Sequence, residues 1–179
     1  IEPDTFIVVN TNWIALAGIH DIYVQIDPQN EVEELDEENN LSYTTCYVVP
    51  DLFIDSTGIA FNNENPLVGD TVLISAAIYN TGSVPASDVK VVILDGSPDD
   101  SLSQVIDTCS IPQIEPSSSA TVQANWLSHY GRHSIYIQVD PDNEIIEPVE
   151  DNNVAFRSIE VLPDLGIDTS SISFEVITS

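Results

Sequence analysis

VDPDNEIIEPVEDNN, residues 139–153, occurs in a second version, IDPQNEVEELDEENN, at residues 26–40. In both stretches an alternating apolar run leads into an Asp-Pro pair, and carboxylates and a closing Asn-Asn pair follow. Apolar residues at every second position are typical of a β-strand with one buried face. Proline lacks the amide hydrogen that a central strand must donate, so the strand is expected to end there. Each of the two stretches therefore predicts the end of a strand followed by an acidic loop.

The spacing between the two copies, 140−27 = 113 residues, holds over a long part of the chain. Without a gap it aligns residues 1–66 with residues 114–179, and about 27 of these 66 positions are identical. A unit of this length is too long for a solenoid repeat and has the size of a domain. The repeat predicts the back half of a domain at residues 1–49, a complete domain at residues 50–162, and the first strand or strands of a following domain at residues 163–179. We expect the chain to be a window on a longer polypeptide.

Residues 50–162 contain about seven short runs with apolar residues on one face, separated by turn signals. The clearest alternations are Val72, Ile74, Ala76 and Ile78; Val89, Val91 and Ile93; and Ile135, Ile137 and Val139. Trp126 is expected to anchor the core, and the Ser-Thr-Gly at residues 56–58 is expected to bend the first strand. The pattern predicts an all-β fold of tandem antiparallel β-sandwiches, immunoglobulin-like or fibronectin-like, with about seven strands per domain.

Composition excludes some classes of partner. The chain has 3 Lys and Arg against 30 Asp and Glu, a formal net charge of −27. Binding to a nucleic-acid backbone needs cationic contacts, and an anionic membrane surface would repel the chain. No apolar run approaches the roughly 18 residues of a membrane span, while an apolar content of 42% supports a packed core. Because like charges repel in the folded state, salt or divalent cations are expected to stabilise it.

The two cysteines, Cys46 and Cys109, fall in different units of the repeat. Cys46 aligns with Ile159, a core-facing strand position, and both thiols are expected to be free and buried. A disulfide between Cys46 and a partner outside this sequence stays open as the alternative. The cysteines therefore do not decide the compartment.

The acidic loop contains the best candidate site. With Asp140 as the first position, Asp142, Glu144 and Asp151 fall at the third, fifth and twelfth, the spacing of oxygen ligands in a calcium loop. These four residues are the candidate ligands of a calcium ion, the one cofactor that the sequence suggests. The match departs from the EF-hand because Ile145 stands where that motif has glycine, and no flanking helices are expected. The alternative is a solvated acidic loop whose Asn side chains close turns on the backbone.

Catalytic motifs are not found in the sequence. His129 and His133 are four residues apart, a spacing that forms a metal pair on a helix, whereas this region predicts turn and strand. His133 aligns with His20, and both are expected to be structural histidines with hydrogen-bonded rings. The serines lack a Gly-x-Ser-x-Gly elbow. We therefore expect that the chain is not an enzyme.

Several pieces of residues 50–153 resemble those of a known family, and the resemblance covers the whole chain. The pieces are Pro50, Asp51 and Leu52; Gly69 and Asp70; Asn80, Thr81 and Gly82; Trp126; and a tail with Asp140, Asn143, Glu147 and residues 150–153. With them the chain resembles the CARDB family, the cell adhesion related domain found in bacteria, as one complete copy and two partial ones. The resemblance implies a β-sandwich module repeated on bacterial or archaeal surface proteins, with an adhesive role and no reaction.

The leading hypothesis is a structural or adhesive module of an extracellular cell-surface or filament-forming protein, which acts through contacts between tandem domains or with a partner. The expected partners are other copies of the repeat, other surface proteins or glycans. Two alternatives stay open. One is a non-catalytic accessory module, for binding or spacing, of a secreted hydrolase, and the other is a calcium-dependent binding module.

Overall fold

The computed structural model of the chain describes residues 5–163, 165, 166, 170, 173 and 175. Strands make up nearly all of its regular structure. They are β1 (Gly18–Gln25), β2 (Leu41–Val48), β3 (Leu52–Phe53), β4 (Ile59–Phe61), β5 (Thr71–Asn80), β6 (Ala86–Asp95), β7 (Gln104–Ile114), β8 (Ser118–Leu127), β9 (Gly131–Val139) and β10 (Val154–Val161). Two 3-10 turns, η1 (Glu37–Asn39) and η2 (Ser56–Gly58), lie between the strands. The all-β prediction is confirmed.

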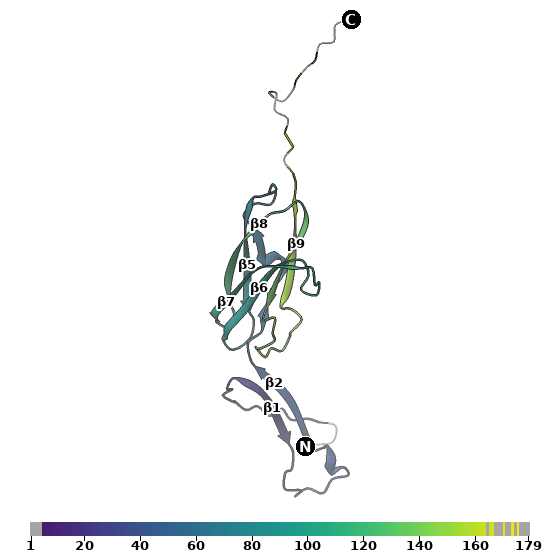
Figure 1. Cartoon of the computed structure of the whole chain (residues 1–179). Coiled ribbons are helices and arrows are strands. Elements are labelled where there is room, and N and C mark those ends of the chain that lie inside the picture. The colour runs from purple at the N-terminus through teal and green to yellow at the C-terminus, as the bar shows by residue number, and fades with distance from the viewer. Residues whose placement is uncertain (1–4, 164, 167–169, 171–172, 174, 176–179) are drawn as a thin grey trace.

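Strands β3 to β10 form two facing antiparallel sheets, a β-sandwich (Figure 1). One sheet has the order β10-β9-β6-β7, and the other has β5 at its centre, with β8 on one side and both β3 and β4 on the other. The turn η2 separates β3 from β4, because the Asp55 carboxylate caps it by accepting hydrogen bonds from the Thr57 and Gly58 amides. The expected bend in the first strand is therefore present.

The core lies between the two sheets. Its inward rows are the alternating residues of the central strands, all at most 1% exposed: Val72, Ile74, Ala76 and Ile78 on β5; Val89, Val91 and Ile93 on β6; and Ile135, Ile137 and Val139 on β9. Trp126 on β8 is buried against them, as expected. Each buried Val or Ile side chain of these rows contributes about 1.5–3 kcal/mol by leaving water, so the alternation that predicted the strands also supplies their stability.

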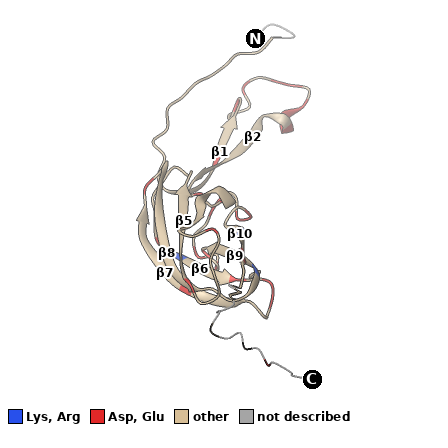
Figure 2. Cartoon of the chain, turned by 90° about the horizontal axis from the view of Figure 1, so that it is seen from above, with Lys and Arg blue, Asp and Glu red and all other residues tan. Residues whose placement is uncertain are grey.

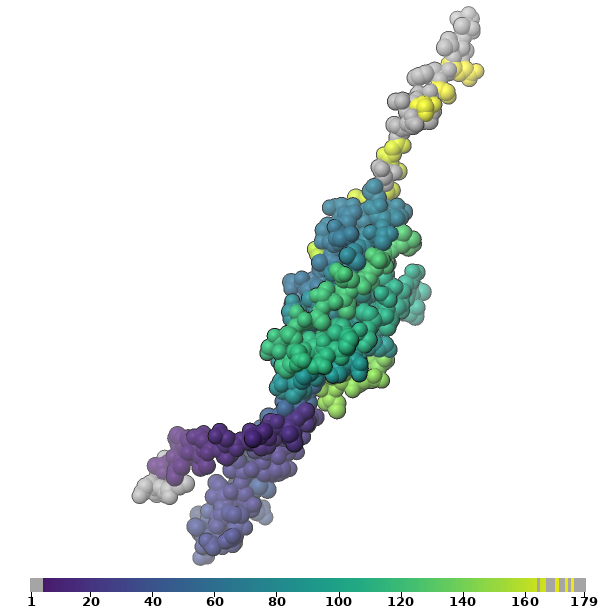
Figure 3. Space-filling view, turned by 90° about the vertical axis from the view of Figure 1, so that its left-hand side faces the viewer, coloured from purple at the N-terminus to yellow at the C-terminus, as the bar shows by residue number. Residues whose placement is uncertain are grey.

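Strands β1 and β2 form a separate two-stranded hairpin, which lies beyond one end of the sandwich (Figures 1 and 3). Its register is that of β9 and β10 displaced by 113 residues: Gly18 pairs with Val48 as Gly131 pairs with Val161. Local contacts recur at the same spacing. The rings of Trp13 and His20 lie 4.8 Å apart, and those of Trp126 and His133 lie 4.9 Å apart. The two hairpins therefore share one local structure.

The two hairpins differ in what covers them. Strand β9 pairs with β10 and with β6, and Ile137 and Val139 are at most 1% exposed. Strand β1 pairs with β2, and the equivalent Val24 and Ile26 are 64% and 61% exposed. Cys46 is only half-buried, in contrast to its buried equivalent Ile159, because the hairpin's apolar face is open. The expectation of a buried thiol at this position is therefore not met.

Cys109, the second cysteine, also carries a free, half-buried thiol, on β7 at the edge of its sheet. Burial, aided by the nearby Asp107 carboxylate, raises the pKa of this thiol above its ordinary value of 9.0. The predicted domain limits stay a prediction, and most of the predicted following piece, residues 163–179, lies outside the described residues. Among the residues that are described, no helix is long and apolar enough to cross a membrane.

Candidate functional site: the segment that enters the sandwich

Residues 49–52 join the hairpin to the sandwich, and we call them the entry segment. Val48 ends β2 and Leu52 begins β3, so three residues lie between the strands. Two loops of the sandwich hold the entry segment: the turn of residues 80–83 after β5, and the acidic loop of residues 140–153 between β9 and β10. We call these two loops together the entry clamp. Most of the pieces quoted for the family resemblance lie in the entry segment and the entry clamp.

Asn80 ties the entry segment to the interior of the domain. Its side chain is fully buried, and its Oδ1 accepts hydrogen bonds from the Asp51 amide at 3.2 Å and the Gly82 amide at 3.0 Å. Its Nδ2 donates to the carbonyl oxygens of Val84, at 2.8 Å, and Ile114, at 3.0 Å. A buried polar group is costly unless it is bonded, so these four bonds fix the turn, the end of β7 and the entry segment in one arrangement.

The turn also contacts the entry segment through its backbone. The Thr81 amide donates to Asp51 O at 2.7 Å, and the Ser83 amide donates to Val49 O at 3.1 Å. Thr81 Oγ1 donates to the Asp51 carboxylate at 2.7 Å. Gly82 permits this approach, because a Cβ atom there would lie 2.5 Å from Val49 O and clash with the Asp51 amide. The Asn-Thr-Gly sequence therefore allows the backbone of the turn to pack directly on the backbone of the entry segment.

Glu147 holds the entry segment from the acidic loop. It is 6% exposed; Oε1 accepts a hydrogen bond from the Leu52 amide at 2.8 Å, and Oε2 accepts one from Asn153 Nδ2 at 2.5 Å. Burial raises the pKa of its carboxyl from the ordinary 4.5 to about 7, although the bonds from Asn153 and Leu52 act in the opposite direction. Glu147 is thus a structural carboxyl group that titrates near neutral pH.

Asn152 completes the acidic loop's contact with the entry segment. In the amide orientation that satisfies both of its polar atoms, Nδ2 donates to Leu52 O at 2.9 Å and to Val149 O at 3.0 Å. The backbone carbonyl of Asn152 accepts from the Ile54 amide at 3.2 Å. The Asn152 side chain therefore bonds to the backbone, the role that was expected of both asparagines, whereas the Asn153 side chain donates to the Glu147 carboxylate instead. Asn152 acts on a strand about 100 residues away, as well as on its own turn.

The four candidate calcium ligands are not gathered into one group. Asp140 is buried and has φ 44°, and its carboxylate accepts from the amides of Glu144, at 3.2 Å, and Ile145, at 2.8 Å. Asp142 pairs with Lys90 Nζ at 2.5 Å, and Glu144 and Asp151 are exposed. Within the described part of the chain, no group of three or more His, Cys, Asp or Glu could hold a metal ion. Calcium needs six to eight oxygens, so this arrangement does not fit it.

Melting curves separate charge screening from calcium binding. The net charge is −27, and Figure 2 shows acidic residues on both hairpin and sandwich. We expect about 0.5 M NaCl to raise the melting temperature by roughly 5 °C over low salt, because screening weakens the repulsion. If the chain binds calcium, the melting temperature must be higher in calcium than in magnesium at equal ionic strength, and the Asp142→Asn variant must lose this difference. Equal shifts with the two cations would contradict calcium binding.

The acidic loop of the hairpin, residues 26–40, has the same internal contacts. Asp27 has φ 43°, and its carboxylate accepts from the amides of Glu31, at 3.0 Å, and Val32, at 2.8 Å. Glu34, the equivalent of Glu147, is exposed, whereas Glu147 is covered by the entry segment, from whose Leu52 amide it accepts a hydrogen bond. The loop conformation is thus set locally, and burial of the carboxylate depends on the segment that the loop holds.

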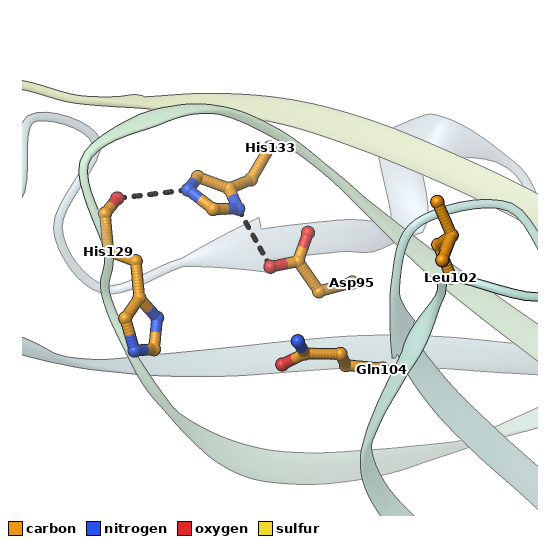
Figure 4. A pocket seen from close by; sticks show the side chains of 5 residues that line it. All are labelled: Asp95, Leu102, Gln104, His129 and His133. Atoms are coloured by element: carbon orange, nitrogen blue, oxygen red, sulfur yellow. Dashed lines mark hydrogen bonds and ion pairs between the residues drawn. The ribbon is translucent and has the colours of Figure 1, made fainter.

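A hollow lies at the end of the sandwich opposite the entry clamp, between the β6–β7 and β8–β9 loops (Figure 4). Its cavity of about 270 Å³ is lined by Asp95, Leu102, Gln104, His129 and His133. Both ring nitrogens of His133 are engaged: Nδ1 with Asp95 Oδ2 at 2.7 Å and Nε2 with His129 O at 2.9 Å. His20 likewise engages Leu16 O at 2.8 Å. These bonds confirm the expected structural histidines.

The sequence alone does not reveal the entry clamp. In the sequence, Glu147 and residues 80–82 are parts of the family resemblance without a physical role, and the acidic loop is a candidate metal site. One signal was available: Glu34 and Glu147 are identical at equivalent positions, and Pro50-Asp51-Leu52 recurs at residues 163–165. The entry segment and Glu147 lie far apart in the sequence, so their contact could not be inferred from it.

Comparison with known proteins gives a family and a fold. The CARDB family model matches residues 49–157. The CARDB domain of a Pyrococcus furiosus protein, crystallised in complex with di-metal ions, is 22% identical with a TM-score of 0.53, over 64% of this chain and 90% of that one. A solution structure from Geobacter metallireducens is 27% identical with a TM-score of 0.50, over 61% of this chain and 95% of that one. Among curated proteins, none matches.

Proposed function

The chain belongs to the CARDB family, and on that premise we propose that it is a structural or adhesive module of an extracellular cell-surface or filament-forming protein. It acts through contacts between successive domains and with further copies, surface proteins or glycans. The entry clamp is the observation that carries this proposal. Its residues hold a piece of chain that arrives from a neighbouring unit, and they hold it by hydrogen bonds and backbone packing.

A short, bonded connection suits a mechanical role. Three residues separate β2 from β3, and the main chain of two of them, Val49 and Asp51, is hydrogen-bonded to the sandwich. A flexible linker needs free rotation about its backbone bonds. The hydrogen bonds of Val49 and Asp51 restrict that rotation in this connection. Domains within a chain otherwise move relative to one another by default. The entry clamp therefore favours a fixed joint, through which one domain sets the direction of the next.

The joint has a direct test in the whole chain. Spin labels at Tyr47→Cys in the hairpin and Thr121→Cys in β8, with Cys46 and Cys109 replaced by serine, report the distance across the joint. We expect one narrow distance distribution, which broadens in Thr81→Ala because that variant loses the side-chain bond to Asp51. Thr108→Ala, an exposed threonine on β7 outside the entry clamp, is the matched control. A broad distribution in the parent protein would contradict the fixed joint.

Cellular location needs a separate measurement. Antibodies raised against residues 50–162 are expected to label intact cells of the source organism without permeabilisation. Protease added to intact cells is expected to remove the epitope. Labelling that requires permeabilisation would contradict the surface location and would leave the result on the joint unchanged.

A further inference from the structure

The outer face of the β10-β9-β6-β7 sheet carries an apolar row that crosses all four strands. Residues directly opposite each other in an antiparallel pair point to the same side of the sheet. Val105 on β7 lies opposite Leu94 on β6. Leu94 lies opposite Tyr136 on β9, and Tyr136 lies opposite Phe156 on β10. Leu94 is outside the core cluster, whereas its neighbour Ile93 is fully buried in it, so the row points away from the core.

A second row lies beside the first on the same face, two residues further along β9. It places Val92 opposite both Thr108 and Gln138, and Gln138 opposite Val154. Three apolar side chains of the two rows are each at least 42% exposed: Phe156, Val154 and Val105. We call the apolar side chains of both rows the outer apolar patch: Val92, Leu94, Val105, Tyr136, Val154 and Phe156.

The outer apolar patch is an uncharged area on an acidic protein. The chain has a net charge of −27, yet all side chains of the two rows are uncharged. Further charged residues of this face lie toward the strand ends: Lys90 at one end, and Arg132 opposite Glu160 at the other. Two of the three Lys and Arg side chains of the chain are therefore on this face. Two acidic chains can approach each other here with little repulsion.

The aromatic part of the patch recurs in the hairpin at the 113-residue spacing. Tyr23 and Tyr43 are the equivalents of Tyr136 and Phe156. The ring centroids lie 5.2 Å apart at 26° in the hairpin and 4.8 Å apart at 19° in the sandwich, so both pairs are stacked. Only about 27 of the 66 aligned positions are identical. A stacked surface pair that is nevertheless present in both units indicates that the outer face of each unit has a role.

The stacking favours a protein face over a sugar as the occupant. A sugar packs its C–H groups on the flat, electron-rich face of an aromatic ring. In this patch one face of each ring is already covered by the other ring, and Leu94 flanks Tyr136 on the next strand. The aliphatic side chains of the patch form no hydrogen bonds with hydroxyl groups. The patch therefore fits a second apolar sheet face, as in sheet-on-sheet packing.

A second copy of the chain supplies such a face, with the same spacing between its units. Strands lie about 4.8 Å apart and the two rows about 7 Å apart, so each patch covers on the order of 300 Å². A stable interface buries about 800 Å² on each partner. One pair of patches is therefore a weak contact, and equivalent contacts of successive units add to it.

We propose that the outer apolar patch packs face to face on the same patch of a second copy, so that chains associate side by side. Each copy contributes the same residues, and the contact is symmetric. This inference rests on the proposed function, in which the chain contacts further copies, and it names the surface that they share. It adds a lateral contact to the end-to-end joint of the entry clamp.

Sedimentation equilibrium of the full chain, from about 10 µM to about 1 mM, tests the contact. We expect a monomer–dimer equilibrium whose association constant rises at least about 10-fold between 0.1 M and 1 M NaCl, because the Debye length falls from about 10 Å to about 3 Å. Phe156→Glu is expected to lower that constant at least about 10-fold relative to Thr121→Glu. This control adds the same charge to the opposite outer face, where Thr121 lies opposite Ala77.

Two further measurements separate the contact from a folding defect and locate it. Phe156→Thr keeps a residue that suits a strand and adds no charge, and it is expected to weaken association as well. Slow hydrogen exchange of the β5 amides shows that each variant is folded. A spin label at Thr108→Cys, with Cys46 and Cys109 replaced by serine, is mixed with isotope-labelled parent chain. We expect it to broaden the amide signals of the patch and to leave those of the opposite outer face sharp.

Three results would overturn the proposal. The first is a chain that stays monomeric at about 1 mM in 1 M NaCl. The second is equal weakening by Phe156→Glu and Thr121→Glu, which would place the contact on another surface. The third is a shift of the Tyr136 and Phe156 ring signals with cellohexaose while the chain stays monomeric, since the occupant would then be a glycan. Failure of surface labelling, or a flexible joint, would contradict the proposed function and leave these results unchanged.

Discussion

Gly82→Ala is expected to lower the free energy of unfolding of the sandwich by about 3 kcal/mol, through loss of about three hydrogen bonds. The new Cβ atom would lie 2.5 Å from Val49 O and from the carbonyl carbon of Pro50, and these backbone atoms cannot rotate away as a side chain would. The turn must then separate from the entry segment. That separation breaks three bonds to the entry segment, those from the Thr81 and Ser83 amides and the one from Thr81 Oγ1 to the Asp51 carboxylate.

The measurement is urea unfolding followed by fluorescence of Trp126, in a Trp13→Phe background that removes the second tryptophan. Gly166→Ala is the matched control, because a Cβ atom at that position meets nothing within 4 Å. A difference of less than about 0.5 kcal/mol between Gly82→Ala and this control would contradict close packing of the two backbones. In the spin-label experiment, Gly82→Ala is expected to broaden the distance distribution further than Thr81→Ala.

The sandwich was predictable because its signals are local. Alternation such as Val72, Ile74 and Ala76 marks both a strand and its buried face within a few residues, and the structure confirms those faces. Trp13 and Trp126 are separated by the same 113 residues as the other repeated positions, which predicts similar local structure around them. The matching registers of the two hairpins confirm this similarity. Prediction succeeded wherever neighbouring residues carry the information.

The entry clamp could not be predicted in the same way. Leu52 and Glu147 are 95 residues apart, and Asp51 and Asn80 are 29 residues apart. In a chain with 30 Asp and Glu, nothing local distinguishes the buried Glu147 from the exposed Glu144. Spacing also suggested that Asp140 would bind a metal ion, whereas its two oxygens accept hydrogen bonds from the backbone of its own loop. A ligand-like spacing does not show where the carboxylates point.

The two acidic loops show how the surroundings change the role of a similar sequence. Asp27 and Asp140 hold their loops by the same pair of backbone bonds, so the loop forms with or without a covering domain. Glu34 stays exposed and Glu147 is buried, because the entry segment reaches only the second loop. The similar sequences therefore specify the loop, and the arriving segment determines the environment of the carboxylate.

Glu147→Gln is expected to remove a large part of the loss of stability between about pH 4.5 and pH 7. Because burial raises the pKa of Glu147 from 4.5 to about 7, the folded state binds this proton more tightly than the unfolded state. The contribution of Glu147 to stability is therefore complete below about pH 4.5 and is lost as the pH rises through 7. The loss amounts to about 3 kcal/mol, at about 1.4 kcal/mol for each unit of pKa.

Glu34→Gln is the matched control, since it removes one carboxylate from the equivalent position of the exposed loop. Both variants change the net charge equally, so the general repulsion among the acidic residues cancels when their pH profiles are compared. We expect Glu34→Gln to keep the parental slope in urea unfolding measured at half-unit pH steps, and Glu147→Gln to flatten it. Parallel profiles for the two variants would mean that the buried carboxyl titrates as an exposed one does, and that the entry segment does not shield it from water.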